Sequence, residues 1–259
     1  MTAQVPAEFR DLAERLADRA GEIARRYFRR PVAVDIKADN TPVSVADRSI
    51  EEMIRTELAR AAPSHGIFGE EFGNERIDAE WVWVIDPIDG TKPFLTGRPT
   101  FGILIGLLHR GRPALGIIDQ PIARERWTGV AGAGATFNGT PIRVRACPDL
   151  ARAAFHANAP ECFEGRFEER FQRLRRAVAF AQYSCDCYPY ALLASGFVDL
   201  VVEIGLKPFD YVALVPVVEG AGGIITDFEG RALDLASDGK VIAAGDPAIH
   251  KAVRDILGV

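Results

Sequence analysis

The sequence has few residues that form disulfides or bind soft metals. Its 259 residues include 4 cysteines and 4 histidines. Four cysteines are too few for a disulfide framework in a chain of this length. Cys185 and Cys187 stand close together, but no nearby cysteine or histidine completes a zinc set. We therefore expect small, buried, reduced thiols at Cys147, Cys162, Cys185 and Cys187, and scattered histidines with structural or surface roles.

Long apolar runs and an excess of positive charge are also absent. No run reaches the roughly 18 residues that a membrane span needs. Charged residues near the N-terminus exclude an apolar signal-peptide core, so we expect a cytoplasmic protein without a membrane partner. The formal net charge is −5. This balance argues against a nucleic-acid partner, because proteins that bind phosphate backbones normally have a basic face.

Hydrophobic patterning divides the chain into two regions. Apolar residues make up 48% of the sequence, enough for a sizeable core. Before about residue 150 the pattern predicts helices at 6–29 and 45–60 and strands at 32–36, 66–68, 81–85, 101–108 and 114–119. Beyond it the pattern predicts strands at 153–157, 177–180, 198–203, 223–226 and 241–244, alternating with helices at 164–176, 186–195, 209–219 and 247–257. We expect an α+β subdomain at residues 1–148 and an α/β subdomain at 149–259.

The most informative segment is WVWVIDPIDGT, residues 81–91. An apolar strand ends in Asp86 and Asp89, within a turn favoured by Pro87 and Gly90. Two carboxylates that converge repel each other unless a proton or a cation neutralises them. Oxygen ligands without histidine or thiolate favour Mg²⁺ or Mn²⁺ over zinc. Asp-Pro and Asp-Gly pairs are also common turn formers, so this segment alone leaves a structural role open.

Four segments together carry a family resemblance. They are Phe68–Glu71 (FGEE), Asp86–Thr91 (DPIDGT), Lys207–Asp210 (KPFD) and Glu219–Gly223 (EGAGG). In order and spacing they resemble the inositol-monophosphatase-like family, over nearly the whole chain. The resemblance implies a layered α/β/α/β/α sandwich of the inositol monophosphatase and fructose-1,6-bisphosphatase type. It further implies a homodimer that acts on a small phosphate ester.

The resemblance also implies a Mg²⁺ site, with Mn²⁺ as a possible substitute. Roughly two to three ions per active site would bind there. The implied ligands are Glu70, Asp86, Asp89, Asp210 and the backbone carbonyl of Ile88. Through these ions a phosphate ester would be hydrolysed by direct attack of a metal-activated water, without a phosphoenzyme.

Three further positions receive catalytic or phosphate-binding roles. Thr91, with Glu70, would orient the water and accept its proton. Gly90 and Thr91 would bind the phosphate through backbone amides if a helix begins there. Asp47 would contact a third, weaker metal through water. The alternative for Asp47 is a first-turn aspartate that stabilises its helix, in a capping box with Ser44.

Substrate choice is expected to depend on Asp186 and Glu203. Inositol-cleaving relatives place small neutral residues where this chain has Asp186, and an unpaired buried charge is costly. Histidinol phosphate has an ammonium group that could pair with both acids. The stretches DCYPYA, GLKPFD and DQPIARERW are similar to the histidinol-phosphate phosphatase branch, which places the reaction in histidine biosynthesis. The alternatives are a helix N-cap at Asp186, an inositol-1-phosphate or broad sugar-phosphate phosphatase, and a non-enzymatic scaffold.

Overall fold

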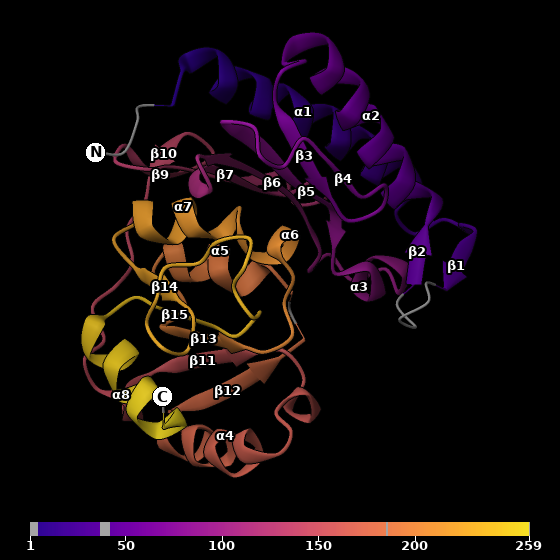
Figure 1. The fold of residues 1–259 in the computed structure, drawn as a ribbon. Coiled ribbons are helices and arrows are strands. Elements are labelled where there is room, and N and C mark those ends of the chain that lie inside the picture. The colour runs from indigo at the N-terminus through magenta and orange to yellow at the C-terminus, as the bar shows by residue number, and fades with distance from the viewer. Residues whose placement is uncertain (1–4, 37–41, 185, 259) are drawn as a thin grey trace.

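Two helices form the outer layer at the N-terminal end of the chain. The computed structural model describes residues 5–36, 42–184 and 186–258. In it, α1 (Ala7–Tyr27) and α2 (Val45–Ala61) lie side by side across one face of a sheet (Figure 1). The predicted capping box starts α2, with Ser44 and Asp47 bonded reciprocally. A short hairpin of β1 (Val34–Ile36) and β2 (Pro42–Ser44) precedes it.

The helices α1 and α2 pack on the larger of two sheets. Its strands are β3 (Gly66–Gly69), β4 (Asn74–Glu75), β5 (Trp81–Asp89), β6 (Gly102–His109), β7 (Arg112–Gln120), β8 (Glu125–Val130), β9 (Gly134–Phe137) and β10 (Thr140–Pro141). Their spatial order is β10-β9-β8-β7-β6-β5-β3-β4. The predicted hairpin of β6 and β7 is present. Only β3 and β5 pair in parallel among these described strands, so their carboxyl ends meet at one edge.

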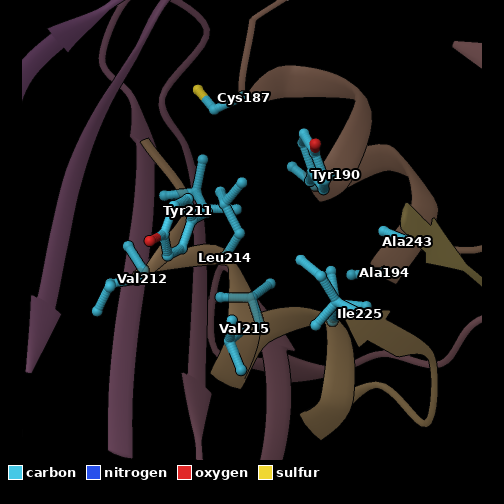
Figure 2. Close-up of a cluster of buried hydrophobic side chains, with 14 of the residues drawn as sticks. Cys187, Tyr190, Ala194, Tyr211, Val212, Leu214, Val215, Ile225 and Ala243 are labelled. Atoms are coloured by element: carbon cyan, nitrogen blue, oxygen red, sulfur yellow. The ribbon is translucent and has the colours of Figure 1, made fainter. Parts of the chain in front are cut away.

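Short helices fill the layer between the two sheets. They are α5 (Tyr188–Ala194), α6 (Pro208–Tyr211) and α7 (Leu214–Gly220). Figure 2 shows side chains of these helices converging in a buried apolar cluster, among them Tyr190, Tyr211 and Leu214. This cluster joins the larger sheet to the smaller one, so the two halves of the chain share one core.

The smaller sheet and two more helices complete the molecule. The sheet contains β11 (Ala154–Ala157), β12 (Phe180–Tyr183), β13 (Leu200–Glu203), β14 (Ile224–Thr226) and β15 (Val241–Ala244), in the order β12-β11-β13-β15-β14. Its far face is covered by α4 (Arg166–Ala177) and α8 (Pro247–Leu257) (Figure 1). The expected α/β/α/β/α layering is thereby confirmed. Across the described ranges, no helix combines the length and the apolar character needed to cross a bilayer.

Three local predictions were wrong. The strand expected at 177–180 begins only at Phe180, because Ala177 closes α4. The helix expected at 209–219 is broken between α6 and α7. Pro216 explains this break, since a helical proline cannot bond to the carbonyl four residues earlier and clashes with it. Of the described cysteines only Cys187 is buried, whereas Cys162 is exposed and Cys147 is half-buried. Cys185 lies outside the described residues.

Candidate active site

The site begins at the carboxyl end of β5, where the strand becomes irregular. The pairing register with β6 shifts between Asp86 and Asp89. An Asp86 carboxylate oxygen accepts the Ile88 N–H at 3.0 Å, which closes a tight turn around Pro87. The turn brings both carboxylates to the rim of one cavity, which also contacts Ile88. The prediction that these two acids converge is confirmed by this geometry.

A third aspartate reaches the same point from α6, more than a hundred residues later. Pro208 stands at the start of this helix, and the Asp210 carboxylate accepts the Lys207 N–H at 2.6 Å. One carboxylate oxygen each of Asp86, Asp89 and Asp210 lies within 4.8 Å of the others. Three carboxylate oxygens this close together have the spacing of ligands around a single cation.

Glu70 joins the cluster through the parallel pairing of β3 with β5. Gly69 stands opposite Ile85 in the register, so Glu70 and Asp86 are the next residues of two adjacent strands. Glu70 lines the same cavity. Its charge acts on Asp86 and on Asp210, raising the pKa of both.

The electrostatics of the cluster favour binding of a cation. Burial, and then the charge of Glu70, raise the pKa of Asp86 well above its ordinary value. Burial and neighbouring acids likewise raise the pKa of Asp89, and burial raises the pKa of Asp210 to about 7. Within the described part of the chain, none of these three aspartates forms an ion pair with a basic side chain. Hard oxygen donors without an internal counter-charge suit a divalent cation such as Mg²⁺.

Thr91 and Asp47 form a pair beside this cluster. The Thr91 hydroxyl lies 3.4 Å from an Asp47 carboxylate oxygen and 3.3 Å from the Ile88 carbonyl. Asp47 is fully buried on α2, and its second oxygen accepts the backbone N–H and the hydroxyl of Ser44. Burial raises the pKa of Asp47, although the Ser44 bonds oppose this change. Asp47 therefore caps its helix, as one alternative predicted, and it also contacts Thr91, whereas its role toward a third metal stays a prediction.

Gly90 links β5 to the short helix α3 (Thr91–Leu95). Its φ of +90° is a conformation that glycine adopts without a steric penalty. A Cβ at Gly90 would lie 2.9 Å from Cγ of Asp186. Glycine is therefore required here for conformation and for the close approach of a loop from the other half of the chain.

The cavity has a volume of about 840 Å³ and extends from the aspartates to the smaller sheet. Every predicted site residue except Asp47 lines it. Asp186 and Glu203 also line it. Glu203 is buried at the end of β13, where the Tyr190 hydroxyl donates to it at 2.9 Å. Burial raises the pKa of Glu203 to about 8, although the Tyr190 bond opposes this change.

Asp186 is held in an unusual conformation. Its φ is +49°, and that of Ser184 is +61°, in the left-handed region that costs energy for most residues. Its Oδ2 atom is buried and has no hydrogen-bond partner among the described residues. Burial raises the pKa of Asp186 to about 6, although Arg98 and Lys92 lower it. Helix α5 starts at Tyr188 with Cys187 as N-cap, so the alternative of an Asp186 N-cap is wrong.

Sequence reasoning missed several residues of this site. Lys92, Arg98 and Asn158 line the cavity, and the Oδ1 atom of Asn158 is buried without a partner in the described structure. The buried Glu51 on α2 contacts the loop that carries Glu70. The sequence did contain a signal for Glu51, because this acid occupies a position on the apolar stripe of its helix. Asn158 gave no signal, because its place depends on how β11 and β13 pair.

Comparison with known proteins identifies the family. The sequence model of the inositol monophosphatase family matches residues 6–257. This chain belongs to the inositol monophosphatase family. It is 47% identical over 258 residues to the bifunctional phosphatase IMPL2, chloroplastic, of Arabidopsis thaliana, covering 96% of this chain and 75% of that protein. It is 36% identical over 234 residues to a histidinol-phosphatase of Chlorobaculum parvum, covering 90% of each.

A solved structure supports the same assignment. An inositol monophosphatase from Zymomonas mobilis superposes with a TM-score of 0.89 at 46% identity, covering 98% of this chain and 100% of that one. The protein is thus a phosphatase of the inositol monophosphatase family, with an acidic cluster suited to a metal ion. The relatives differ in the substrates that their names give, so the family alone does not assign one.

Proposed function

We propose that this protein is a Mg²⁺-dependent phosphomonoesterase that hydrolyses histidinol phosphate to histidinol and phosphate. The observation that carries the substrate assignment is the buried, unpartnered carboxylate oxygen of Asp186. It lies in the same cavity as the three clustered aspartates. A neutral polyol has no charge to offer such a group, whereas an alkylammonium does.

The acids at the β5 end form the phosphate end of the site in this proposal. The ligands would be Glu70, Asp86, Asp89, Asp210 and the carbonyl of Ile88. When bound, divalent cations neutralise the phosphate oxygens, lower the pKa of a water molecule and stabilise the leaving oxygen. The oxygen-rich, cation-poor donor set fits such ions.

The residues beside the cluster handle the attacking water. The Thr91 hydroxyl can donate to Asp47, which leaves its oxygen lone pairs to accept a hydrogen bond from water. Glu70 lines the same cavity and is the proposed proton acceptor. Water adds its oxygen to phosphorus, the ester P–O bond breaks, and the leaving alkoxide takes up a proton. Gly90 and Thr91 are the proposed backbone contacts of the phosphate.

Another part of the same cavity would hold the cationic part of the substrate. Asp186 and Glu203 both line it, and each acid raises the electrostatic cost of ionising its neighbours. An ammonium group between them would relieve that repulsion. The relative named histidinol-phosphatase, 36% identical over most of the chain, supports this choice.

Inositol-1-phosphate or a broader set of sugar phosphates is the second candidate. Its support is the Zymomonas mobilis inositol monophosphatase, which shares 46% of aligned residues and the whole fold. In this case Asp186 and Glu203 would accept hydrogen bonds from substrate hydroxyls. The two candidates differ in whether a charge at Asp186 is needed.

Asp186→Asn tests this difference directly. Asparagine tolerates the left-handed conformation, so the variant removes the charge and leaves the loop in place. We expect kcat/KM for histidinol phosphate to fall by roughly 30- to 100-fold, as for a lost hydrogen bond to a charged group. The value for inositol-1-phosphate should change by less than about threefold. Wild type and variant hydrolysing both substrates equally well would contradict the proposal.

A further inference from the structure

Glu51 is a buried acid that contacts the metal-ligand loop without lining the cavity. It lies on α2 and has an exposed fraction of 0%. One carboxylate oxygen accepts the Glu71 N–H at 2.7 Å, and the other accepts the Phe72 N–H at 3.1 Å. The Glu51 carboxylate thus binds the two backbone amides that directly follow Glu70.

The residue before Glu70 is held by the same carboxylate. A Cβ at Gly69 would lie only 2.1 Å from a Glu51 oxygen, closer than any real Cβ contact. Gly69 also closes the loop by donating its N–H to the Gly73 carbonyl at 3.3 Å. The backbone on both sides of Glu70 is therefore fixed against α2, which leaves its side chain little freedom of direction.

The charge of Glu51 is balanced locally. The Arg55 Nε atom donates to it at 2.8 Å, one helical turn further along α2. Arg55 also pairs with Glu75 at 2.9 Å and donates to the Gly73 carbonyl. Because the Arg55 guanidinium balances the negative charge of Glu51, this carboxylate needs no external cation, unlike the acids in the cavity.

Helix α2 connects two parts of the site. Asp47, which contacts Thr91, lies four residues before Glu51, so both acids project from adjacent turns. We infer that Glu51 is a positioning residue that fixes Glu70 for cation binding, relative to Asp47 on the same helix and to Thr91, which Asp47 contacts. The inference rests on the proposed function only in taking Glu70 as a metal ligand.

Glu51→Gln is the direct test, with the neighbouring exposed Glu52→Gln as matched control. The single carbonyl oxygen of glutamine cannot replace two carboxylate oxygens that accept separate N–H groups. In the metal-free protein we expect the Glu71 and Phe72 amides to exchange hydrogen at least about tenfold faster. Calorimetric titration with Mn²⁺ alone should show affinity weakened by roughly 10- to 100-fold, the usual effect of a residue that orients a ligand.

Gly69→Ala provides a second, independent variant, because its methyl group displaces the Glu51 carboxylate without removing it. It should reproduce the weaker Mn²⁺ binding, and it decides the question if Glu51→Gln does not fold. The inference would be overturned if these variants fold and exchange the Glu71 and Phe72 amides faster, but still bind Mn²⁺ as tightly as wild type. A wild-type protein without measurable Mn²⁺ binding would instead reject the metal-dependent function itself.

Discussion

Two clusters of carboxylates in this molecule contrast with each other. One surrounds Arg126 on β8, whose guanidinium binds Glu14 at 2.7 Å, Asp18 at 2.9 Å and Asp119 at 2.7 Å. The other, at the end of β5, contains three aspartates with no such partner among the residues described. Both clusters line cavities, of about 1010 and 840 Å³. Cavity size therefore does not distinguish them.

The difference lies in the source of the counter-charge. Burial disfavours the charged form of Arg126, but its acids outweigh this effect and raise its pKa above the ordinary value. Glu14, Asp18 and Asp119 thus share a guanidinium partner supplied by the chain itself. Burial and neighbouring acids raise the pKa of Asp86 and Asp89, and no basic side chain among the described residues pairs with them. The contrast indicates a structural role for the cluster around Arg126 and cation binding at the cluster at the end of β5.

The largest effect is expected at Asp210. Asp210→Asn removes one of three converging charges, and we expect phosphatase activity to fall by about 10³-fold. The metal-free variant should be at least as stable as wild type, because a repelling charge is lost. Phosphate release and urea unfolding in EDTA measure the two quantities. An inactive variant that is also strongly destabilised would assign Asp210 a mainly structural role.

The opposite pattern is expected at Arg126. Arg126→Met leaves the buried Asp119 carboxylate unpaired, which should cost about 3 kcal/mol of unfolding free energy. Activity per folded molecule should stay the same, since Arg126 does not line the active-site cavity. Arg124→Gln, on the exposed neighbour, is the control and should change stability by less than about 0.5 kcal/mol. Lost activity at full stability would show that the two clusters are coupled.

The sequence predicted the acids of the active site better than the contacts that support them. DPIDGT could be interpreted because turn formers, an apolar strand and two acids lie in eleven consecutive residues, from Trp81 to Thr91. The helices and strands followed from hydrophobic periodicity, and their layering followed from the family resemblance. The pairing of Arg126 with Glu14 could not be predicted, because the two residues lie 112 positions apart and only tertiary packing of α1 on the sheet joins them.

Backbone conformation at the site could likewise not be predicted from sequence patterns. Asp186 was singled out by its charge, but neither its left-handed φ of +49° nor its close approach to Gly90 could be predicted from the sequence. Glu51 shows the same limit. Its helical position was predicted, whereas its contact with the Glu70 loop depends on how α2 crosses β3 and β5.

Adding a metal ion should distinguish the two clusters through its effect on stability, and this effect should be of intermediate size. A cation that binds only the folded state, at about 100 times its Kd, stabilises by roughly 2.7 kcal/mol. In a protein of this size we expect Mn²⁺ to raise Tm by roughly 5–10 °C. Asp210→Asn should show little of this rise, and Arg126→Met should show all of it from a lower baseline. Tm is measured by calorimetry. Equal rises in Tm for wild type and Asp210→Asn would place the bound ion elsewhere.

The smallest effect is expected at a third, isolated pair. Asp199 is buried and accepts hydrogen bonds from Nε and Nη2 of Arg145, each at 2.6 Å, and from the Ala154 N–H at 2.7 Å. Burial alone would raise the pKa of Asp199, but these hydrogen bonds outweigh it and lower the pKa below its ordinary value. Asp199→Asn should cost about 2 kcal/mol at pH 7.

The pH dependence of that cost follows from the direction of the shift. A lowered pKa means that the folded state holds the proton less tightly than the unfolded state, so the stabilisation is complete above the unfolded pKa of about 3.9. It is lost as the pH falls through the lower value of the folded state. The stability difference between wild type and Asp199→Asn, from urea unfolding at several pH values, should therefore be constant from pH ~8 to ~5 and shrink below about 4. A difference that grows on acidification would mean that Asp199 is protonated more readily in the folded protein than in the unfolded one, as expected for the unpaired aspartates at β5.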